Sequence, residues 1–174
     1  GFLFENVPSI KHPRNRHIYE KFVRSAKERG YHVTELVASA TDFGAPQSRE
    51  RVFVLGSKLN RPKAPVPTHG QASALIQGVK PIVTAGEALQ GLDRKKYFEP
   101  EEVVSGRYAQ HLAEIPPGWN YKALTTWAGH ANPSFVAETR FWNFLLKLSP
   151  DRPSWTIAAS PGPWTGPFHW TSRR

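Results

Sequence analysis

The sequence predicts an α/β fold whose elements follow in the order strand, helix, strand, strand. Three observations support this order: an apolar run at residues 1–4, helical spacing of apolar side chains at residues 18–26, and two later stretches, 31–40 and 52–55, rich in β-branched or apolar residues. Strand and helix patterns that follow one another in this order are typical of α/β proteins. After Gly56 the pattern ends and the composition of the chain changes.

The first predicted strand ends at a candidate site residue. The apolar residues 1–4 are followed directly by Glu5 and Asn6. Ligands of open α/β sheets bind at the carboxyl ends of the strands, so Glu5 would lie where a ligand is held. A solvated loop carboxylate is the alternative explanation of so short a motif.

The predicted helix has an apolar stripe and a charged face. Ile18, Phe22 and Ala26 follow the i, i+4, i+8 spacing of an amphipathic helix, with Tyr19 and Val23 beside them. Gly30 supplies a stop signal at the C-terminal end. The solvent-facing residues are expected to be Lys21, Arg24, Lys27 and Glu28.

A tight turn feeds the last strand of this region, within residues 42–56. The short branched and aromatic run 52–55 is typical of a covered strand. Residues two apart in an extended segment share a face, so Gln47, Arg49 and Arg51 would point the same way. Two guanidinium groups and an amide suit a planar ligand that carries oxygen atoms. An exposed strand end with solvated charges remains the alternative.

The rest of the chain offers fewer regular signals. Residues 58–68 contain three prolines and three basic residues, which indicates an extended connection. Thr84 and Glu87 have the spacing of a capping box and predict the start of a short helix. Periodicity fades over residues 93–135, and a compact apolar run follows at 141–148. Irregular segments of this kind are often recognition loops, although ordinary irregular surface is more common.

Composition limits the classes of protein that fit. The 174 residues could form one domain, or one lobe with a small second domain, and the net charge of +9 is common among nucleic-acid binders. The absence of cysteine excludes disulfides, thiolate metal sites and a cysteine nucleophile within this chain. The seven histidines show no metal-binding spacing, so no metal site is predicted.

Targeting signals and the start of the chain lead to two further expectations. There is neither a signal-peptide pattern nor an apolar run long enough to span a membrane, which favours a soluble intracellular protein. The chain starts at Gly1 without a methionine, so we expect it to be a piece of something longer.

Three stretches, taken in order, resemble motifs of the DNA (cytosine-5) methyltransferase family. Residues 4–7, Phe-Glu-Asn-Val, resemble its ENV motif. Residues 43–51 resemble the segment that ends in its Q-x-R-x-R motif, and residues 152–157, Arg-Pro-Ser-Trp-Thr-Ile, resemble the motif that follows its target-recognition region. The resemblance spans nearly the whole chain and rests on the order and spacing of the three motifs.

The resemblance implies a particular domain organisation. It implies a partial Rossmann-like methyltransferase lobe, together with a small, irregular, mainly β target-recognition domain. The expected segments are the C-terminal part of the catalytic lobe at 1–60, a connection with a short helix at 61–92, the target-recognition domain at 93–150, and a return segment to the lobe at 151–174.

The resemblance also implies roles for five residues. Glu5 would contact N3 and the exocyclic amine of a cytosine, which helps the family's cysteine thiolate to add to C6. Arg51 would hold the O2 oxygen and Arg49 would brace the pocket, while Asn6 fixes the local turn and Gln47 organises the turn before the strand. The cytosine would have to be flipped out of the helix stack.

The implied partner is double-stranded DNA, and the implied cofactor is S-adenosylmethionine. Contacts to phosphates and groove edges are expected from the basic stretch between about residues 92 and 140, with the candidates Arg94, Lys95, Lys96, Arg107 and Lys122. The expected location is the cytoplasm, on DNA, in a bacterial or phage-like restriction–modification setting.

Two motifs of the family have no counterpart in the chain. Its glycine-rich cofactor loop and its Pro-Cys motif precede the ENV motif, so no cofactor-binding residue is predicted here. A complementary chain or N-terminal half is expected to supply both, and the chain by itself is expected to be inactive. Two alternatives remain: a non-catalytic DNA-binding module derived from a truncated or decayed methyltransferase, and an unrelated basic α/β domain.

Overall fold

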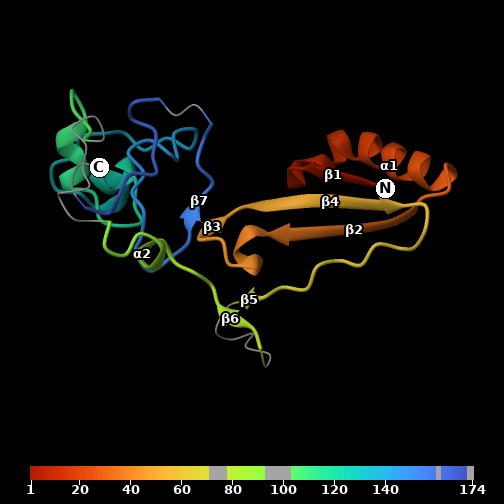
Figure 1. Ribbon diagram of the computed structural model, residues 1–174. Helices are drawn as coiled ribbons and strands as arrows, with labels where there is room; N and C mark the ends of the chain where they lie inside the picture. Colours follow the sequence, from red (N-terminus) through yellow and green to blue (C-terminus); the bar gives the residue numbers. More distant parts are fainter. Residues whose placement is uncertain (71–77, 93–102, 160–161, 172–174) are drawn as a thin grey trace. The chain divides into compact units, whose positions relative to one another are not determined.

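The computed structural model describes residues 1–70, 78–92, 103–159 and 162–171, which belong to two units (Figure 1). The first unit comprises Gly1–Ala45 and Arg49–Ile82, and the second comprises Pro46–Ser48 and Val83–Arg174. Each unit has its own buried hydrophobic cluster and is described by itself. None of the described helices combines the length and the apolar character needed to cross a membrane.

A three-stranded sheet forms the frame of the first unit. Its strands are β1 (Phe2–Asn6), β2 (His32–Ser39) and β4 (Glu50–Ser57), in the spatial order β1-β4-β2. The central strand β4 runs antiparallel to both neighbours. The predicted order strand, helix, strand, strand is therefore confirmed, and the strand that carries Arg51 occupies the middle of the sheet.

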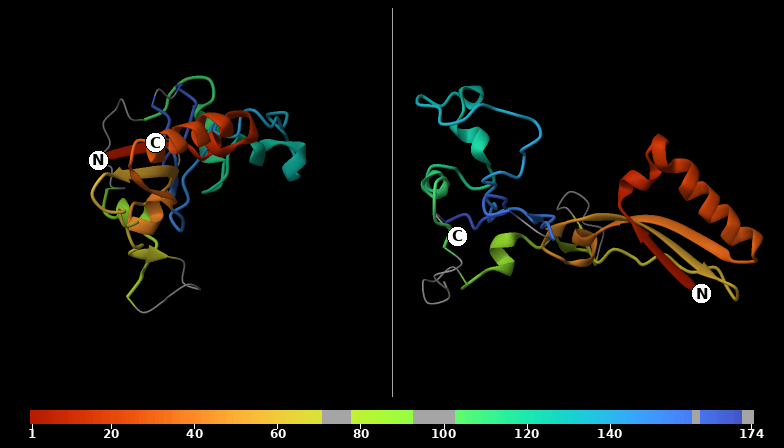
Figure 2. Two further views of the ribbon diagram at one scale, coloured as in Figure 1. Left: turned by 90° about the vertical axis from the view of Figure 1, so that its right-hand side faces the viewer. Right: turned by 90° about the horizontal axis from the view of Figure 1, so that it is seen from above.

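Helix α1 (Pro13–Glu28) packs on one face of this sheet (Figures 1 and 2). Its buried residues are Tyr19, Val23 and Ala26, which pack against Val33, Val52 and Val54 of the strands. The stripe differs from the predicted one, because Ile18 is 55% exposed. The three residues that face the sheet follow an i, i+4, i+7 spacing along the helix, and Ile18 lies at the edge of this row.

The turn before β4 is held by local hydrogen bonds. After the 3-10 turn η2 (Ala40–Phe43), Gly44 has a φ of 86°, a conformation that glycine adopts without strain. The backbone N–H of Ala40 donates to the carbonyl of Arg49 at 2.9 Å, which closes the loop at the start of β4. Beyond this sheet, β5 (His69–Gly70) and β6 (Lys80–Pro81) form a short parallel pair.

The second unit is irregular, as predicted. Its helix α2 (Ala85–Ala88) begins at the predicted capping box of Thr84 and Glu87. Two-residue strands β3 (Gln47–Ser48) and β7 (Ser154–Trp155) pair in parallel. The other described elements are the 3-10 helices η6 (Ala109–Ala113), η7 (Tyr121–Leu124) and η8 (Thr126–Ala128).

A mainly β character was expected for this unit, but its described residues form more 3-10 turn than strand. Prolines interrupt the segments that could pair, as at Pro116 and Pro117, because a proline donates no ladder hydrogen bond. The core is instead built by side chains from separate turns: Leu112, Ile115, Tyr121, Leu124 and Leu145.

Candidate functional site

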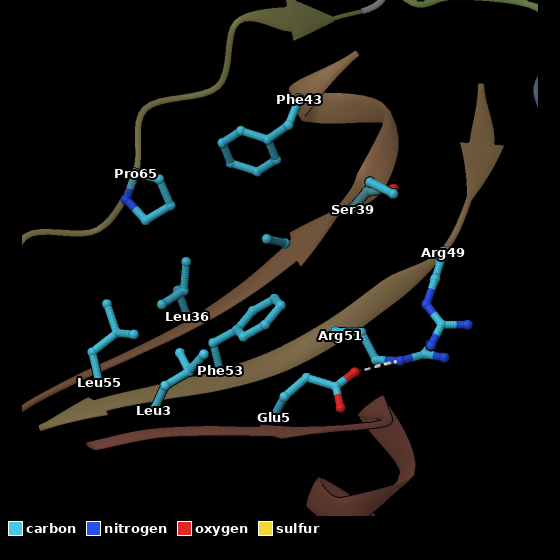
Figure 3. A pocket seen from close by; sticks show the side chains of 12 residues that line it. Leu3, Glu5, Leu36, Ser39, Phe43, Arg49, Arg51, Phe53, Leu55 and Pro65 are labelled. Carbon is cyan, nitrogen blue, oxygen red and sulfur yellow. Dashed lines mark ion pairs between the residues drawn. The ribbon is translucent and has the colours of Figure 1, made fainter. Parts of the chain in front are cut away.

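Glu5 and Arg51 form an ion pair on the sheet face that does not carry α1. Glu5 lies opposite Phe53 in the β1–β4 register, so Arg51 is its diagonal neighbour on the same face. Two long side chains can span that diagonal, and the Nε of Arg51 lies 2.7 Å from Oε1 of Glu5 (Figure 3). Residues 46 positions apart in the sequence are therefore joined by strand register.

The pair lies at one end of a hollow of about 530 Å³. Figure 3 shows Arg49 at the same end, beside Arg51, while apolar side chains line the rest. All three strands and the segments that flank them contribute to these apolar walls: Leu3, Leu36, Phe43, Phe53, Leu55 and Pro65. We call this hollow the Glu5–Arg51 pocket. Its few charged groups stand beside apolar walls, as in many ligand sites.

The guanidinium of Arg51 is held by two acceptors. Its Nε donates to Glu5, and its Nη1 donates to the backbone carbonyl of Glu50 at 2.6 Å. The side chain of Arg51 is 16% exposed, whereas that of Glu5 is 44% exposed. No described residue accepts a hydrogen bond from Nη2 of Arg51 or donates one to Oε2 of Glu5, so each can meet a ligand.

Arg49 enters the pocket from the link between β3 and β4. Its backbone carbonyl is fixed by Ala40, and its side chain is half-buried among the lining residues. Among the described residues it has no ion-pair partner. The predicted alternation is confirmed in the pattern of exposure, because Ser48 and Glu50 are exposed while Arg49 and Arg51 are not.

The two residues predicted to support the site, Asn6 and Gln47, belong to different units. Oδ1 of Asn6 accepts a hydrogen bond from the backbone N–H of Val7 at 2.8 Å, at the end of β1. Gln47 lies in β3, where it pairs with Ser154 of β7 within the second unit. Gln47 is not among the residues that line the Glu5–Arg51 pocket.

Of the five residues predicted to contact DNA, two lie among the described residues. Arg94, Lys95 and Lys96 lie outside the described residues. Arg107 is exposed, with its guanidinium carbon 5.1 Å from the ring centroid of Tyr108. Lys122 is half-buried, with Nζ 5.8 Å from the ring centroid of Trp127.

The apolar walls of the pocket were not identified from the sequence. Leu3 is 67% exposed although it belongs to the apolar run that predicted the first strand. Strict alternation of apolar residues could have signalled that this run has two different faces, but the run is apolar at every position. A covered strand was expected for 52–55, and there Phe53 and Leu55 face the pocket instead.

The described residues provide no metal cluster, and the connection between the first strand and the first helix lacks one feature of a cofactor loop. No group of three or more His, Asp or Glu side chains that could hold a metal occurs among them. The connection from β1 to α1, residues 7–12, contains no glycine, so it lacks the close backbone approach of a glycine-rich cofactor turn. The residues present therefore do not fit S-adenosylmethionine at this strand–helix junction.

Comparison with known proteins places these residues in a family context. The family model for C-5 cytosine-specific DNA methylases matches residues 1–118, a range that includes Glu5, Arg49 and Arg51. The type II methyltransferase M.SacI of Streptomyces achromogenes is 41% identical over 175 residues, which cover 98% of the chain and 44% of that protein. The type II methyltransferase M.NgoFVII of Neisseria gonorrhoeae is 27% identical over 176 residues, covering 99% of the chain and 45% of that protein.

A solved structure shares the fold. It is described as a DNA modification methyltransferase encoded within a prophage of E. coli, and it matches with a TM-score of 0.50 at 16% identity. The match covers 94% of this chain and 54% of that one. The chain thus spans about half the length of the proteins that it resembles.

Proposed function

Because the chain belongs to the C-5 cytosine-specific DNA methylase family, we propose that its first unit holds the target cytosine of DNA during methyl transfer to C5. One observation carries the proposal: Glu5 and Arg51 are paired at 2.7 Å in a pocket that Arg49 also lines. Carboxylate and guanidinium side by side complement a ring edge on which a carbonyl oxygen adjoins a nitrogen.

The free atoms of the pair suit the edge of cytosine. Nη2 of Arg51 donates to O2, and Oε2 of Glu5 meets the side of the ring that carries N3 and the exocyclic amine. C5 is a poor nucleophile until a thiolate adds to C6, and charge then develops across the ring. Groups already fixed around that charge lower the barrier, because they do not have to reorganise during the reaction.

Arg49 has a supporting role in this proposal. Its positive charge at the same end of the pocket favours a ligand edge rich in electrons and attracts the carboxylate of Glu5. Asn6 fixes the backbone directly after Glu5 through its hydrogen bond to Val7. Gln47 organises the turn that precedes Arg49.

The base must leave the DNA helix to reach such a pocket. The apolar walls then exclude water from around the ring, which strengthens the interactions of the charged groups with it. The pocket volume of about 530 Å³ is within the range of small-molecule sites.

The thiolate and the methyl donor come from elsewhere in this proposal. The 174 residues contain no cysteine, so a complementary chain or an N-terminal segment supplies the nucleophile. It also supplies the loop for S-adenosylmethionine, which provides the methyl group. The residues of this chain orient the base and stabilise its charge.

Recognition of double-stranded DNA is assigned to residues 93–150, which belong to the second unit. Arg107 and Lys122 are the described cations in this assignment, and Arg94, Lys95 and Lys96 are the others. Phosphate contacts supply affinity for any sequence, and contacts to base edges supply the choice of site. Residues 1–60 act as part of the catalytic lobe, 61–92 connect the two segments, and 151–174 return to the lobe.

A chimaera with M.SacI tests the proposal. The matched 44% of M.SacI is replaced by this chain, and transfer of labelled methyl groups from S-adenosylmethionine to DNA is measured. We expect transfer by the chimaera and none by the 174-residue chain alone. Glu5→Gln and Arg51→Ala should each lower the transfer rate about 10²–10³-fold, as when one preorganised group is lost, with little change in DNA binding.

Matched controls separate the site from general effects of charge. Glu28→Gln and Arg24→Ala remove the same kinds of group from α1, away from the pocket, and should leave transfer unchanged. Thermal melts must show that each variant is folded. A folded Glu5→Gln chimaera with full activity would refute the assignment.

An exchange of segments tests the recognition assignment. Residues 93–140 are transplanted into complete M.SacI, and the methylated cytosines are mapped. The set of methylated sites should change with the transplanted segment. If it stays that of the host, recognition lies elsewhere.

A further inference from the structure

Four of the six tryptophans gather around one groove of the second unit. Trp119, Trp127, Trp142 and Trp155 line it, and the first three are 47%, 70% and 49% exposed. Their sequence positions follow no period, so the groove is a product of the fold. We call it the tryptophan groove. A cluster of large exposed aromatic rings is costly in water and marks a binding surface.

The walls of the tryptophan groove are joined by hydrogen bonds through Asn120. Its Oδ1 accepts from the backbone N–H of Lys122 at 3.0 Å, and its Nδ2 donates to the carbonyl of Trp142 at 2.6 Å. A further bond runs from the N–H of Lys147 to the carbonyl of Trp119 at 2.8 Å. The backbones that carry Trp119 and Trp142 are thus held in place before any ligand binds, which lowers the entropic cost of binding.

The chemistry of the tryptophan groove suits a flat aromatic ligand with a negative charge. Indole faces bind planar π systems, and base–aromatic stacking accepts every base. Lys122 also lines the groove, with Nζ 5.8 Å from the centroid of Trp127, and provides a positive charge. The volume of about 240 Å³ lies below that of sites for drug-sized molecules and suits a single ring system.

We propose that the tryptophan groove binds a nucleobase of the DNA that has left the helical stack, with the adjoining phosphate on Lys122. This site is additional to the Glu5–Arg51 pocket, and it rests on the proposed function in taking DNA as the partner. The net charge of +9 favours a polyanion over an apolar peptide. Leu146 is the one aliphatic side chain that lines the groove, whereas a peptide groove would offer more.

The fluorescence of the tryptophans provides a readout for the test. The 174-residue chain is titrated with a labelled duplex of about twelve base pairs that carries one unpaired adenine, and with the same duplex carrying an abasic site instead. Anisotropy of the label measures binding of the duplex, and tryptophan fluorescence measures occupation of the groove. We expect fluorescence quenching by the adenine duplex, and about tenfold weaker binding of the abasic one.

Variants assign the signal to the groove. Trp127→Ala, at a mainly exposed side chain, should remove most of the preference for the unpaired adenine, and Trp127→Phe should keep part of it. Phe141→Ala is the matched control, because Phe141 is 45% exposed and does not line the groove. If Arg51→Ala removes the preference and Trp127→Ala does not, the base enters the Glu5–Arg51 pocket and the proposal is overturned.

Failure of this proposal can be told from failure of the proposed function. If both duplexes bind with equal affinity and without quenching, DNA binding stands and the base site is overturned. If neither duplex binds, the proposed role in DNA binding fails. Titration with deoxyadenosine monophosphate then tests whether the groove binds a nucleotide. Quenching that Trp127→Ala abolishes would support the site, and no quenching would overturn it.

Discussion

Replacing Tyr19 by phenylalanine removes a single hydrogen bond between α1 and the sheet that carries the site. The hydroxyl of Tyr19 donates to Oε2 of Glu35 on β2 at 2.6 Å, while the ring is 6% exposed in the core. The ring stays packed in Tyr19→Phe, so only the hydroxyl and its bond are lost. Because Glu35 is exposed and water competes for it, the expected loss in unfolding free energy at neutral pH is about 1 kcal/mol.

The cost of Tyr19→Phe should depend on pH with a definite sign. Burial of Tyr19, and then its hydrogen bond to Glu35, raise the pKa of its hydroxyl well above the ordinary value of 10.0. Above pH 10 the unfolded chain therefore releases a proton that the folded chain keeps, so the wild type becomes less stable as the pH rises. The phenylalanine variant lacks this loss, which amounts to at most about 1.4 kcal/mol per pH unit.

Urea unfolding followed by circular dichroism between about pH 8 and pH 11 measures both effects. The stability difference between wild type and Tyr19→Phe should be constant below the ordinary tyrosine pKa and should shrink above it. Tyr31→Phe is the matched control, since Tyr31 packs against the same core and its hydroxyl has no hydrogen-bond partner among the described residues. A difference that stays constant up to pH 11 would refute the reasoning, as would no difference at any pH.

Two further predictions concern Lys147 and Gly44. Lys147 is 3% exposed, its Nζ donates to the carbonyl of Leu112 at 2.8 Å, and burial lowers the pKa of its ammonium below the ordinary 10.5. Wild-type stability in urea titrations should therefore rise relative to Lys147→Met as the pH rises from the lowered pKa towards 10.5. Parallel pH profiles would contradict this. In Gly44→Ala the new Cβ would lie 2.6 Å from Cε1 of His69, whereas Gly30→Ala meets nothing within 4 Å at a similar positive φ. Both variants carry backbone strain of about 1 kcal/mol, so thermal melts should show the larger loss for Gly44→Ala, and equal melts would rule out the clash.

The regular elements of the first unit were predictable because each has a local signal. The apolar run of 1–4, the helical spacing and the branched stretches correspond to β1, α1, β2 and β4. The facing of α1 was predicted less well, because two apolar rows lie side by side on the helix. Contact with the sheet selects the row of Tyr19, Val23 and Ala26, and no signal within the helix distinguishes it from the row of Ile18.

The three charged residues of the candidate site could be named from the sequence, but its apolar walls and its geometry could not. Alternation along the strand places Arg49 and Arg51 on one face, and this depends on neighbouring residues alone. The contact between Arg51 and Glu5 depends on the register of β4 against β1, which is set by the packing of the whole sheet. The apolar walls depend on the same register and on the loop that brings Pro65 to the hollow.

The core of the second unit could not be predicted from the sequence, for a different reason. Its core joins turns that are distant in sequence, so no period marks Leu112, Tyr121 and Leu145 as neighbours. Lys147 lies inside an apolar run and is buried with it, which composition alone would not indicate. The tryptophan groove has the same origin, because its four rings come from separate turns and from β7.

In the proposed function, Glu5 and Arg51 act as one pair, and the sheet supports this pair. Two nitrogens of Arg51 are engaged by Glu5 and by the carbonyl of Glu50, so the guanidinium plane is fixed before a ligand arrives. A lysine could not reproduce this, because its compact ammonium lacks the planar fork that binds two acceptors and presents a third donor in one plane. In the proposed function, the carboxylate that would meet the ligand is thus also the group that orients the arginine. Loss of Glu5 should therefore disorder Arg51 as well, and the effects of the two substitutions on activity should not add.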